Sequence, residues 1–283
     1  MPTAVAAPDA SSAIRRDRRS PAAIGRDARL ELVFAVRDGR TMLVHGYAEP
    51  PFRVSRPFEC DGELHMMLTS SGPGVFGGDR LRQDIRLAAG ARVRLTSQAA
   101  VQVHPGNSEA IASLVSHFDV EHDARLACQW LPAIPFAAAH FEQRIAVNLA
   151  ENAALYWSDG FMAGRAGMGE RWRFAHLAHE LRLVRAGVLE YLERYAIEPA
   201  SSRLESHWIA ADALYFGSVV VSGVPCSRDR VEALHTALGL NANLRAAVDG
   251  LGPALCVTRL ASASGPAFHA ARATLDASFQ SNL

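Results

Sequence analysis

The sequence predicts a mainly β protein, with an irregular two-layer β-coil or sandwich-like body and a small C-terminal α/β appendage. Apolar and polar residues alternate in much of the first two thirds of the chain, turn residues recur at nearly regular intervals, and a helical pattern appears only after about residue 200. We therefore expect a disordered tail over residues 1–27, a β-rich body over 28–200, and an appendage over 201–283 packed on the body.

The body is expected to begin with a β-hairpin. Apolar side chains alternate with polar ones from Leu30 to Val36, and Asp38-Gly39 separates them from a second apolar run. An Asp-Gly pair between two such runs is the strongest short hairpin signal. Further strands are expected at 63–69, 82–88, 92–98, 125–130, 141–149, 153–158, 180–185 and 188–197.

Four segments repeat one local design, in which an apolar strand end, a turn residue and a second apolar strand follow one another. The turn residues are Gly90, Asp123, Asn152 and Gly187, and they are separated by 33, 29 and 35 positions. This spacing predicts stacked strand-turn-strand units. A plain antiparallel sandwich with similar hairpins fits the same spacing and stays open as the alternative.

The appendage is predicted from an alternation of strand and helix patterns. A strand is expected at 219–224, a helix at 228–239, a strand at 254–261 and an amphipathic helix at 266–279. This order is typical of a small α/β unit, and Gly239 suits the end of the first helix.

The charge of the chain argues against nucleic acid and against anionic membranes as partners. Its 29 basic residues balance 29 acidic residues, so no excess of positive charge is available for either. No apolar run approaches the roughly 18 residues of a membrane span. All the basic residues are arginine, and the absence of lysine excludes a Walker A loop, a protein kinase and Schiff-base chemistry.

The cysteines indicate neither a disulfide framework nor a zinc site. Cys60, Cys128, Cys226 and Cys256 lie far apart and form no C-x-x-C pair. Isolated thiols of this kind fit a protein of the reducing cytoplasm, where we expect the chain to act.

The stretch GPGVFGGDR at residues 72–80 is the most unusual in the chain. A phosphate-binding loop would be followed by a helix, but LRQDIRLAAG alternates like a strand. The glycines therefore predict a tight crossing between two strands, with positive φ at some of Gly72, Gly74, Gly77 and Gly78. The simplest interpretation of the next residue, Asp79, is that it caps this turn and pairs with a nearby arginine.

No catalytic or metal-binding motif stands out among the remaining residues. His176, His179 and Glu180 form the tightest histidine group, but on a strand the two histidines lie on opposite faces, which disfavours a closed zinc site. No G-x-S-x-G sequence is present, and sequence alone cannot bring the scattered carboxylates together.

Seven segments, in order along the chain, resemble the UreD (UreH) family of urease accessory proteins. They are RPF at 56–58, GPGVFGGDRL at 72–81, LAAGARVRLTSQAA at 87–100, WLP at 130–132, FEQR at 141–144, GRAGMGE at 164–170 and LERYAI at 192–197. The resemblance runs from about residue 30 to residue 260. Its most specific part is the pair of glycines with an acid, followed by the G-A-x-x-x-L-T-x-Q-A block.

The resemblance implies a non-enzymatic chaperone that acts in urease activation. Proteins of this family bind the urease apoprotein and the partner UreF, which recruits the GTPase UreG, and Ni²⁺ passes toward the urease site. The family implies transient Ni²⁺ without a tightly bound cofactor, travelling through a water-filled passage lined by acidic and polar side chains. Carboxylates and waters hold Ni²⁺ loosely enough to let it move, whereas a cage of cysteine and histidine would trap it.

Four acids are expected to line that passage. Carried over by position, Asp79 matches the family acid after the paired glycines, Glu170 the acid of G-x-x-x-x-G-E, and Glu193 the acid of the Glu-Arg pair. Asp159 is the fourth, because it follows Trp157-Ser158, which stands where the family has Trp-Asp. In this interpretation the glycine-rich loop holds Asp79 near the passage.

Some segments depart from the family pattern. AVQVH at 100–104 replaces a segment with a lysine and a tyrosine, Asp159 comes one place late and so faces the other side of a strand than Ser158, and the sequence ends before the proline-rich terminus of typical members. Two alternatives therefore stay open. One is a divergent β-rich scaffold for another client protein, and the other is a hydrolytic enzyme that needs two carboxylates in a closed pocket with a raised pKa.

Overall fold

The computed structural model describes residues 25–107, 110–201, 203–206 and 209–280. Most of the expected tail, residues 1–24, lies outside the described residues. Its last three residues belong to the folded body, because the first strand begins at Asp27 and Arg26 forms an ion pair with Asp79. None of the described helices is both long enough and apolar enough to cross a bilayer.

The described strands form three sheets, which we call A, B and C. Sheet A has the spatial order β16 (Val188–Ile197), β15 (His176–Arg185), β13 (His140–Leu149), β10 (Ala112–Val120), β7 (Arg80–Leu87), β1 (Asp27–Arg37) and β2 (Arg40–Ala48). Sheet B has the order β18 (Leu244–Gly252), β19 (Leu255–Ser262), β17 (Tyr215–Ser222), β14 (Ala154–Met162), β11 (Arg125–Gln129), β8 (Arg92–Ser97), β5 (Glu63–Ser70) and β3 (Phe52–Val54), and β4 (Phe58–Cys60) also pairs with β5. The small sheet C contains β12 (Ile134–Pro135), β9 (Gln102–His104) and β6 (Val75–Phe76).

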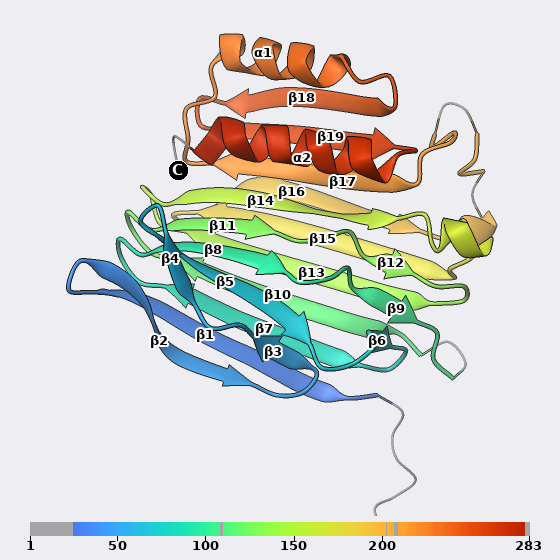
Figure 1. Cartoon of the computed structure of the whole chain (residues 1–283), viewed down its shortest axis with the longest axis horizontal. Helices are drawn as coiled ribbons and strands as arrows, with labels where there is room; N and C mark the ends of the chain where they lie inside the picture. The colour runs from blue at the N-terminus through green and yellow to red at the C-terminus, as the bar shows by residue number, and fades with distance from the viewer. Residues whose placement is uncertain (1–24, 108–109, 202, 207–208, 281–283) are drawn as a thin grey trace, which may run out of the picture.

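The chain winds through these sheets as a β-coil. Three successive coils start at β5, β8 and β11, and each runs from sheet B through sheet C to sheet A, so that neighbouring coils pair in parallel. In Figure 1 the strands lie in layers across the view, from blue β1 and β2 at the bottom to the orange and red C-terminal elements at the top. The β-coil prediction is confirmed, whereas the antiparallel sandwich is not, because the coils are parallel.

The recurring turns join sheet A back to sheet B. Gly90 and Asp123 lie in the first two such turns with φ of 71° and 58°, and Asn152 lies in the third. Gly187 belongs instead to the hairpin between β15 and β16, which pair antiparallel. The predicted Asp38-Gly39 hairpin joins β1 to β2, also with positive φ at both residues.

The main core lies between sheets A and B. Alternate residues of each strand face inward there and are almost fully buried, as Leu30, Leu32 and Phe34 are in β1. Because side chains alternate between the two faces of a strand, any polar side chain on an inward position is enclosed between the sheets.

The C-terminal elements continue sheet B. β17 pairs antiparallel with β14, and β19 and β18 follow it outward, so the expected appendage shares a sheet with the body. The predicted strand, helix, strand and helix correspond to β17, α1 (Arg228–Gly239), β19 and α2 (Gly265–Gln280). Sequence analysis missed β18, whose LRAAVDGLG sequence is weak in strand-favouring residues.

Both helices pack with the outer face of sheet B around a second apolar cluster, which includes Tyr156, Phe268 and Phe279. The buried side chain of Arg94 fastens α2 to the sheet, because its Nη1 lies 3.0 Å from Asp276 Oδ1. The guanidinium of Arg272 reaches from α2 into sheet B, where its Nε donates to Ser158 Oγ at 2.8 Å.

Candidate functional site

The glycine-rich loop is a strand crossing, as the sequence predicts. It carries β6 into β7 with no intervening helix, and φ is positive at Gly74 and Gly78 but not at Gly72 or Gly77. Gly77 is needed for a different reason, because a Cβ atom there would lie 2.5 Å from the Cα of Gly106. The close packing of Gly77 against Gly106 therefore fixes the backbone conformation immediately before Asp79.

Asp79 points back into its own turn. Its side chain is 1% exposed, and it accepts hydrogen bonds from the backbone N–H of Phe76 at 2.9 Å and of Arg26 at 2.8 Å. The Arg26 guanidinium lies 2.5 Å from Asp79 Oδ2. Burial alone would raise the pKa of Asp79, but these hydrogen bonds outweigh it and lower the pKa below its ordinary value. This geometry is the turn cap and arginine pair of the simplest interpretation.

Glu170 is held in a similar way. The Arg165 guanidinium donates to it, with Arg165 Nε 2.8 Å from Glu170 Oε2, and the backbone N–H of Ala137 donates to the same oxygen at 3.1 Å. The hydrogen bond from Arg165 is the main cause of its lowered pKa. Neither Asp79 nor Glu170 lines either of the cavities described below.

The two arginines that hold these acids lie over the outer rings of one row of three aromatic side chains. Phe76 and His104 stack with ring centroids 4.5 Å apart, and the His104 ring meets Phe136, which follows β12, edge to face at 4.4 Å. The guanidinium of Arg26 lies 5.6 Å from the Phe76 ring, and that of Arg165 lies 3.8 Å from the Phe136 ring. Asp79 and Glu170 therefore hold the two arginines that pack on these aromatic rings beside sheet C.

Two cavities, the second of them open to solvent, share Asp159 and Gly160 in their walls. The first, of about 280 Å³, lies between sheets A and B. The second, of about 480 Å³, lies beside β16 and the inner face of β17 and β19. Because Asp159 and Gly160 of β14 line both cavities, the two spaces adjoin one another there. We call the two cavities together the passage.

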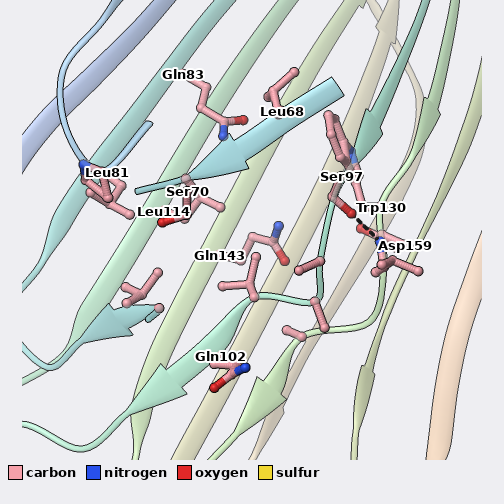
Figure 2. A pocket seen from close by; sticks show the side chains of 18 of the residues that line it. Leu68, Ser70, Leu81, Gln83, Ser97, Gln102, Leu114, Trp130, Gln143 and Asp159 are labelled. Carbon is pink, nitrogen blue, oxygen red and sulfur yellow. Dashed lines mark hydrogen bonds between the residues drawn. The ribbon is translucent and has the colours of Figure 1, made fainter. Parts of the chain in front are cut away.

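Polar side chains from both sheets face the first cavity. Gln83, Ser116 and Gln143 reach it from β7, β10 and β13 of sheet A, opposite Asp159 of sheet B. Figure 2 shows the labelled side chains of Gln83, Gln143 and Asp159 around this space. Ser116 Oγ donates to Gln83 Oε1 at 3.1 Å, and a ring nitrogen of His179 lies 3.4 Å from Gln143 Oε1.

Sequence analysis did not single out these polar residues, although a signal for them exists. Gln83 stands between Leu81 and Ile85, and Gln143 between Phe141 and Ile145, on the inward face of otherwise apolar alternations. A polar residue at such a position marks either a satisfied core contact or the wall of an internal space.

Asp159 is the least satisfied acid of the passage. Its side chain is 7% exposed, and Oδ2 has no hydrogen-bond partner among the described residues. His179 Nε2 lies 3.8 Å from that oxygen, and Ser218 Oγ lies 3.5 Å from Oδ1. Burial raises the pKa of Asp159, against the opposing effects of His179 and of the nearby Trp157 side chain, and the neighbouring charge of Glu193 raises it further.

Glu193 lines the second cavity and is fully engaged. Arg259 Nη1 lies 2.7 Å from its Oε1, and the Tyr191 hydroxyl donates to its Oε2 at 3.0 Å. Arg259 Nη2 also donates to the Tyr191 hydroxyl oxygen at 3.1 Å. Burial raises the pKa of Tyr191, so this hydroxyl keeps its proton at neutral pH.

The structure thus brings Asp159 and Glu193 together and places Asp79 and Glu170 elsewhere. Trp157 and Asp159 share the inner face of β14, while Ser158 faces Arg272, in agreement with the expected opposite orientation of Ser158 and Asp159. His179 also faces inward, whereas His176 and Glu180 pair on the other face with Glu198 and Arg194.

No group of three or more histidine, cysteine, aspartate or glutamate side chains gathers around one point in the described part of the chain. The passage instead offers single oxygen and nitrogen ligands spaced along its wall. Carboxylate, amide and hydroxyl oxygens with one imidazole suit a divalent cation that is bound weakly and exchanges between positions.

Comparison with known proteins identifies the family. The model of the UreD urease accessory protein family matches residues 26–281. The chain is 31% identical over 259 residues to the urease accessory protein UreD of Deinococcus radiodurans, covering 89% of this chain and 91% of that protein. It is 32% identical to UreD 2 of Streptomyces griseus, covering 77% and 76%, and 25% identical to UreH of Helicobacter pylori, covering 82% and 87%. The sequence resemblance is therefore confirmed, and the chain belongs to the UreD family of urease accessory proteins.

Proposed function

We propose that this protein is a non-enzymatic chaperone of urease maturation that acts in the cytoplasm, in a complex with UreF and, through UreF, UreG, and guides Ni²⁺ to the urease apoprotein. The family match supports a role in urease maturation, and the relatives are all named accessory proteins. The single observation that carries the nickel proposal is Asp159, a buried acid at the junction of the two cavities, one oxygen of which has no hydrogen-bond partner among the described residues.

In this proposal the passage is the route for Ni²⁺. Asp159 provides negative charge inside a space that would otherwise repel a dication, because moving a cation out of water is costly unless an acid compensates. Its unpartnered oxygen can bind the ion directly. His179 is within reach of the same point, and the amide oxygens of Gln143 and Gln83 lie further along the cavity wall.

Weak binding is what a route requires. A closed four-ligand site would hold nickel too long, whereas separate ligands let the ion pass from one to the next. The proposed cargo is therefore transient Ni²⁺, and no tightly bound cofactor is part of the proposal. Nucleotide hydrolysis is assigned to UreG, in keeping with the absence of lysine from this chain.

Two linked experiments test this function. The first is co-expression of the chain with UreF and UreG, followed by affinity capture and size-exclusion chromatography, and a stable complex of all three is expected. The second is nickel analysis of urease produced with and without the chain, which should show a large loss of metal when the chain is missing. Urease that is fully loaded without the chain would overturn the proposal and favour a scaffold for another client.

A further inference from the structure

The two acids of the passage differ sharply in how their charge is balanced. Glu193 meets the guanidinium of Arg259 at 2.7 Å and the hydroxyl of Tyr191 at 3.0 Å, so both of its oxygens are engaged. Asp159 has His179 Nε2 at 3.8 Å from Oδ2, which has no hydrogen-bond partner among the described residues, and the side chain of Trp157 nearby. The guanidinium of Arg259, a cation of the protein itself, therefore already occupies the cation position beside Glu193.

Arg259 is well placed to leave that position. It projects from β19, lines the second cavity together with Glu193, and its side chain is 55% exposed, whereas that of Glu193 is 7% exposed. The acid is therefore fixed inside the protein and the arginine reaches it from the solvent side. The guanidinium can turn outward without opening the core, because its partner, and not Arg259, is the buried member of the pair.

The chemistry of the pair also fits an exchange. Arginine stays charged at any physiological pH, so it cannot release Glu193 by losing a proton. A divalent cation carries twice its charge and needs the same carboxylate oxygens, so the two compete for one position. With Arg259 in place, the passage carries one uncompensated acid; with Arg259 displaced, it carries two.

We propose that Arg259 is a latch that occupies the cation position at Glu193 and must be displaced before a divalent metal ion binds between Glu193 and Asp159. This inference rests on the proposed function and adds a control element to it. The latch keeps the passage from holding cations permanently, because the protein's own guanidinium returns to Glu193 after the ion has moved on.

The test measures binding of Ni²⁺ alone to the untagged, full-length chain by isothermal titration calorimetry at pH 7.5. Arg259→Gln should bind Ni²⁺ about tenfold or more tightly than wild type, because the metal no longer has to displace a charge-assisted hydrogen bond from Glu193. Arg259→Lys should restore weak binding, because an ammonium group still neutralises Glu193.

Two further variants keep the test specific. Arg194→Gln removes another arginine–glutamate pair, in which Arg194 Nε lies 2.8 Å from Glu180, on the outer face of β16, the strand that carries Glu193, and should leave Ni²⁺ affinity unchanged. The double variant Arg259→Gln with Glu193→Gln should not show the increased Ni²⁺ affinity, because the carboxylate of Glu193 is no longer present. Circular dichroism and melting curves establish that each variant is folded.

Three results would contradict the latch. They are an Arg259→Gln variant that binds Ni²⁺ no more tightly than wild type, an equal increase of Ni²⁺ affinity in Arg194→Gln, or an increase that persists in the double variant. Because calorimetry uses the isolated chain, its result does not depend on urease. If Arg259→Gln binds Ni²⁺ more tightly but urease is fully loaded with nickel in the absence of the chain, the latch stands as a cation site and the proposed function fails.

Discussion

The carboxylate of Asp79 is buried beneath the guanidinium of Arg26, with Arg26 Nη2 2.5 Å from Asp79 Oδ2. These residues lie 53 positions apart, and their contact ties the start of β1 to the glycine-rich loop that precedes β7. Since β1 and β7 also pair in parallel, this ion pair fixes the first strand of the body on the coil.

Replacing Asp79 by alanine should therefore reduce stability. The change leaves the part-buried backbone N–H groups of Arg26 and Phe76 without their shared acceptor and removes the ion pair with Arg26, so we expect a loss of about 2–3 kcal/mol in the free energy of unfolding. Urea denaturation at pH 7.5 measures it. Asp27→Ala breaks an exposed pair with Arg80 and is the matched control, for which little change is expected.

The difference in unfolding free energy between wild type and Asp79→Ala should also depend on pH. The pKa of Asp79 is lowered in the folded protein, so its contribution is complete above the ordinary aspartate pKa of about 3.9 and is lost as the pH falls below that value. The stability gap between wild type and Asp79→Ala should be constant from pH 8 to about pH 5 and narrow below about pH 4. A gap that is unchanged down to pH 2 would show that the charge of Asp79 contributes nothing.

Ionisation of Asp159 should destabilise the folded protein, whereas ionisation of Asp79 stabilises it. Burial raises its pKa, so its ionisation opposes folding above the pKa of the unfolded chain, and this cost disappears once both states are protonated. Asp159→Asn should therefore melt at a higher temperature than wild type at pH 7.5, with the difference closing toward pH 3. A lower melting temperature at pH 7.5 would mean that the carboxylate is needed for stability, as in an ordinary core pair.

The glycine-rich loop allows a test with its own control. Gly77→Ala would place a methyl group 2.5 Å from the Cα of Gly106, where only backbone movement makes room, and should cost more than about 2 kcal/mol of unfolding free energy. Gly72→Ala places its Cβ 3.4 Å from the end of the flexible Arg26 side chain and should be nearly neutral. Equal effects at both positions would contradict the close crossing of the two glycine backbones.

The buried side chain of Arg94, which reaches from β8 to Asp276 of α2, should stabilise the packing of α2 on sheet B. Arg94→Ala leaves Asp276 and Glu63 without their shared cation, and removing one partner of a buried pair costs about 3 kcal/mol. Amide hydrogen exchange should show faster exchange in α2, while the coil strands of sheet A stay protected. Arg92→Ala, at an exposed position of the same strand, should leave the exchange of α2 unchanged.

Much of the fold could be predicted because the strands depend on local pattern. The alternation from Leu30 to Val36 and the Asp38-Gly39 turn give the first hairpin, and the spacing of Gly90, Asp123 and Asn152 gives the coil. The strands of sheet C could not be predicted, because they contain only two or three residues and exist through pairing with the coils above and below. β10 carries a clear alternation from Ala112 to Val120 and was missed, although its pattern was readable.

The candidate site shows where sequence reasoning ends. Asp79 and Asp159 are the same amino acid near equally suggestive motifs, yet one is buried against Arg26 and the other faces an internal cavity. The difference lies in which distant residue reaches each carboxylate, and a sequence does not contain that pairing. The inward position of Asp159 on β14 could be read from its parity with Trp157, but not the space beside it.

The most direct test of the account is the nickel content of urease matured with Asp159→Asn. Asn keeps the size and hydrogen-bonding capacity of the side chain and removes the charge at the junction of the two cavities. Asp84→Asn is the control, since Asp84 pairs with Arg82 on the outer face of sheet A. Urease purified after co-expression should contain several-fold less nickel with Asp159→Asn than with wild type or Asp84→Asn, while capture of UreF and UreG is unchanged. Full nickel occupancy with Asp159→Asn would contradict a route through this passage.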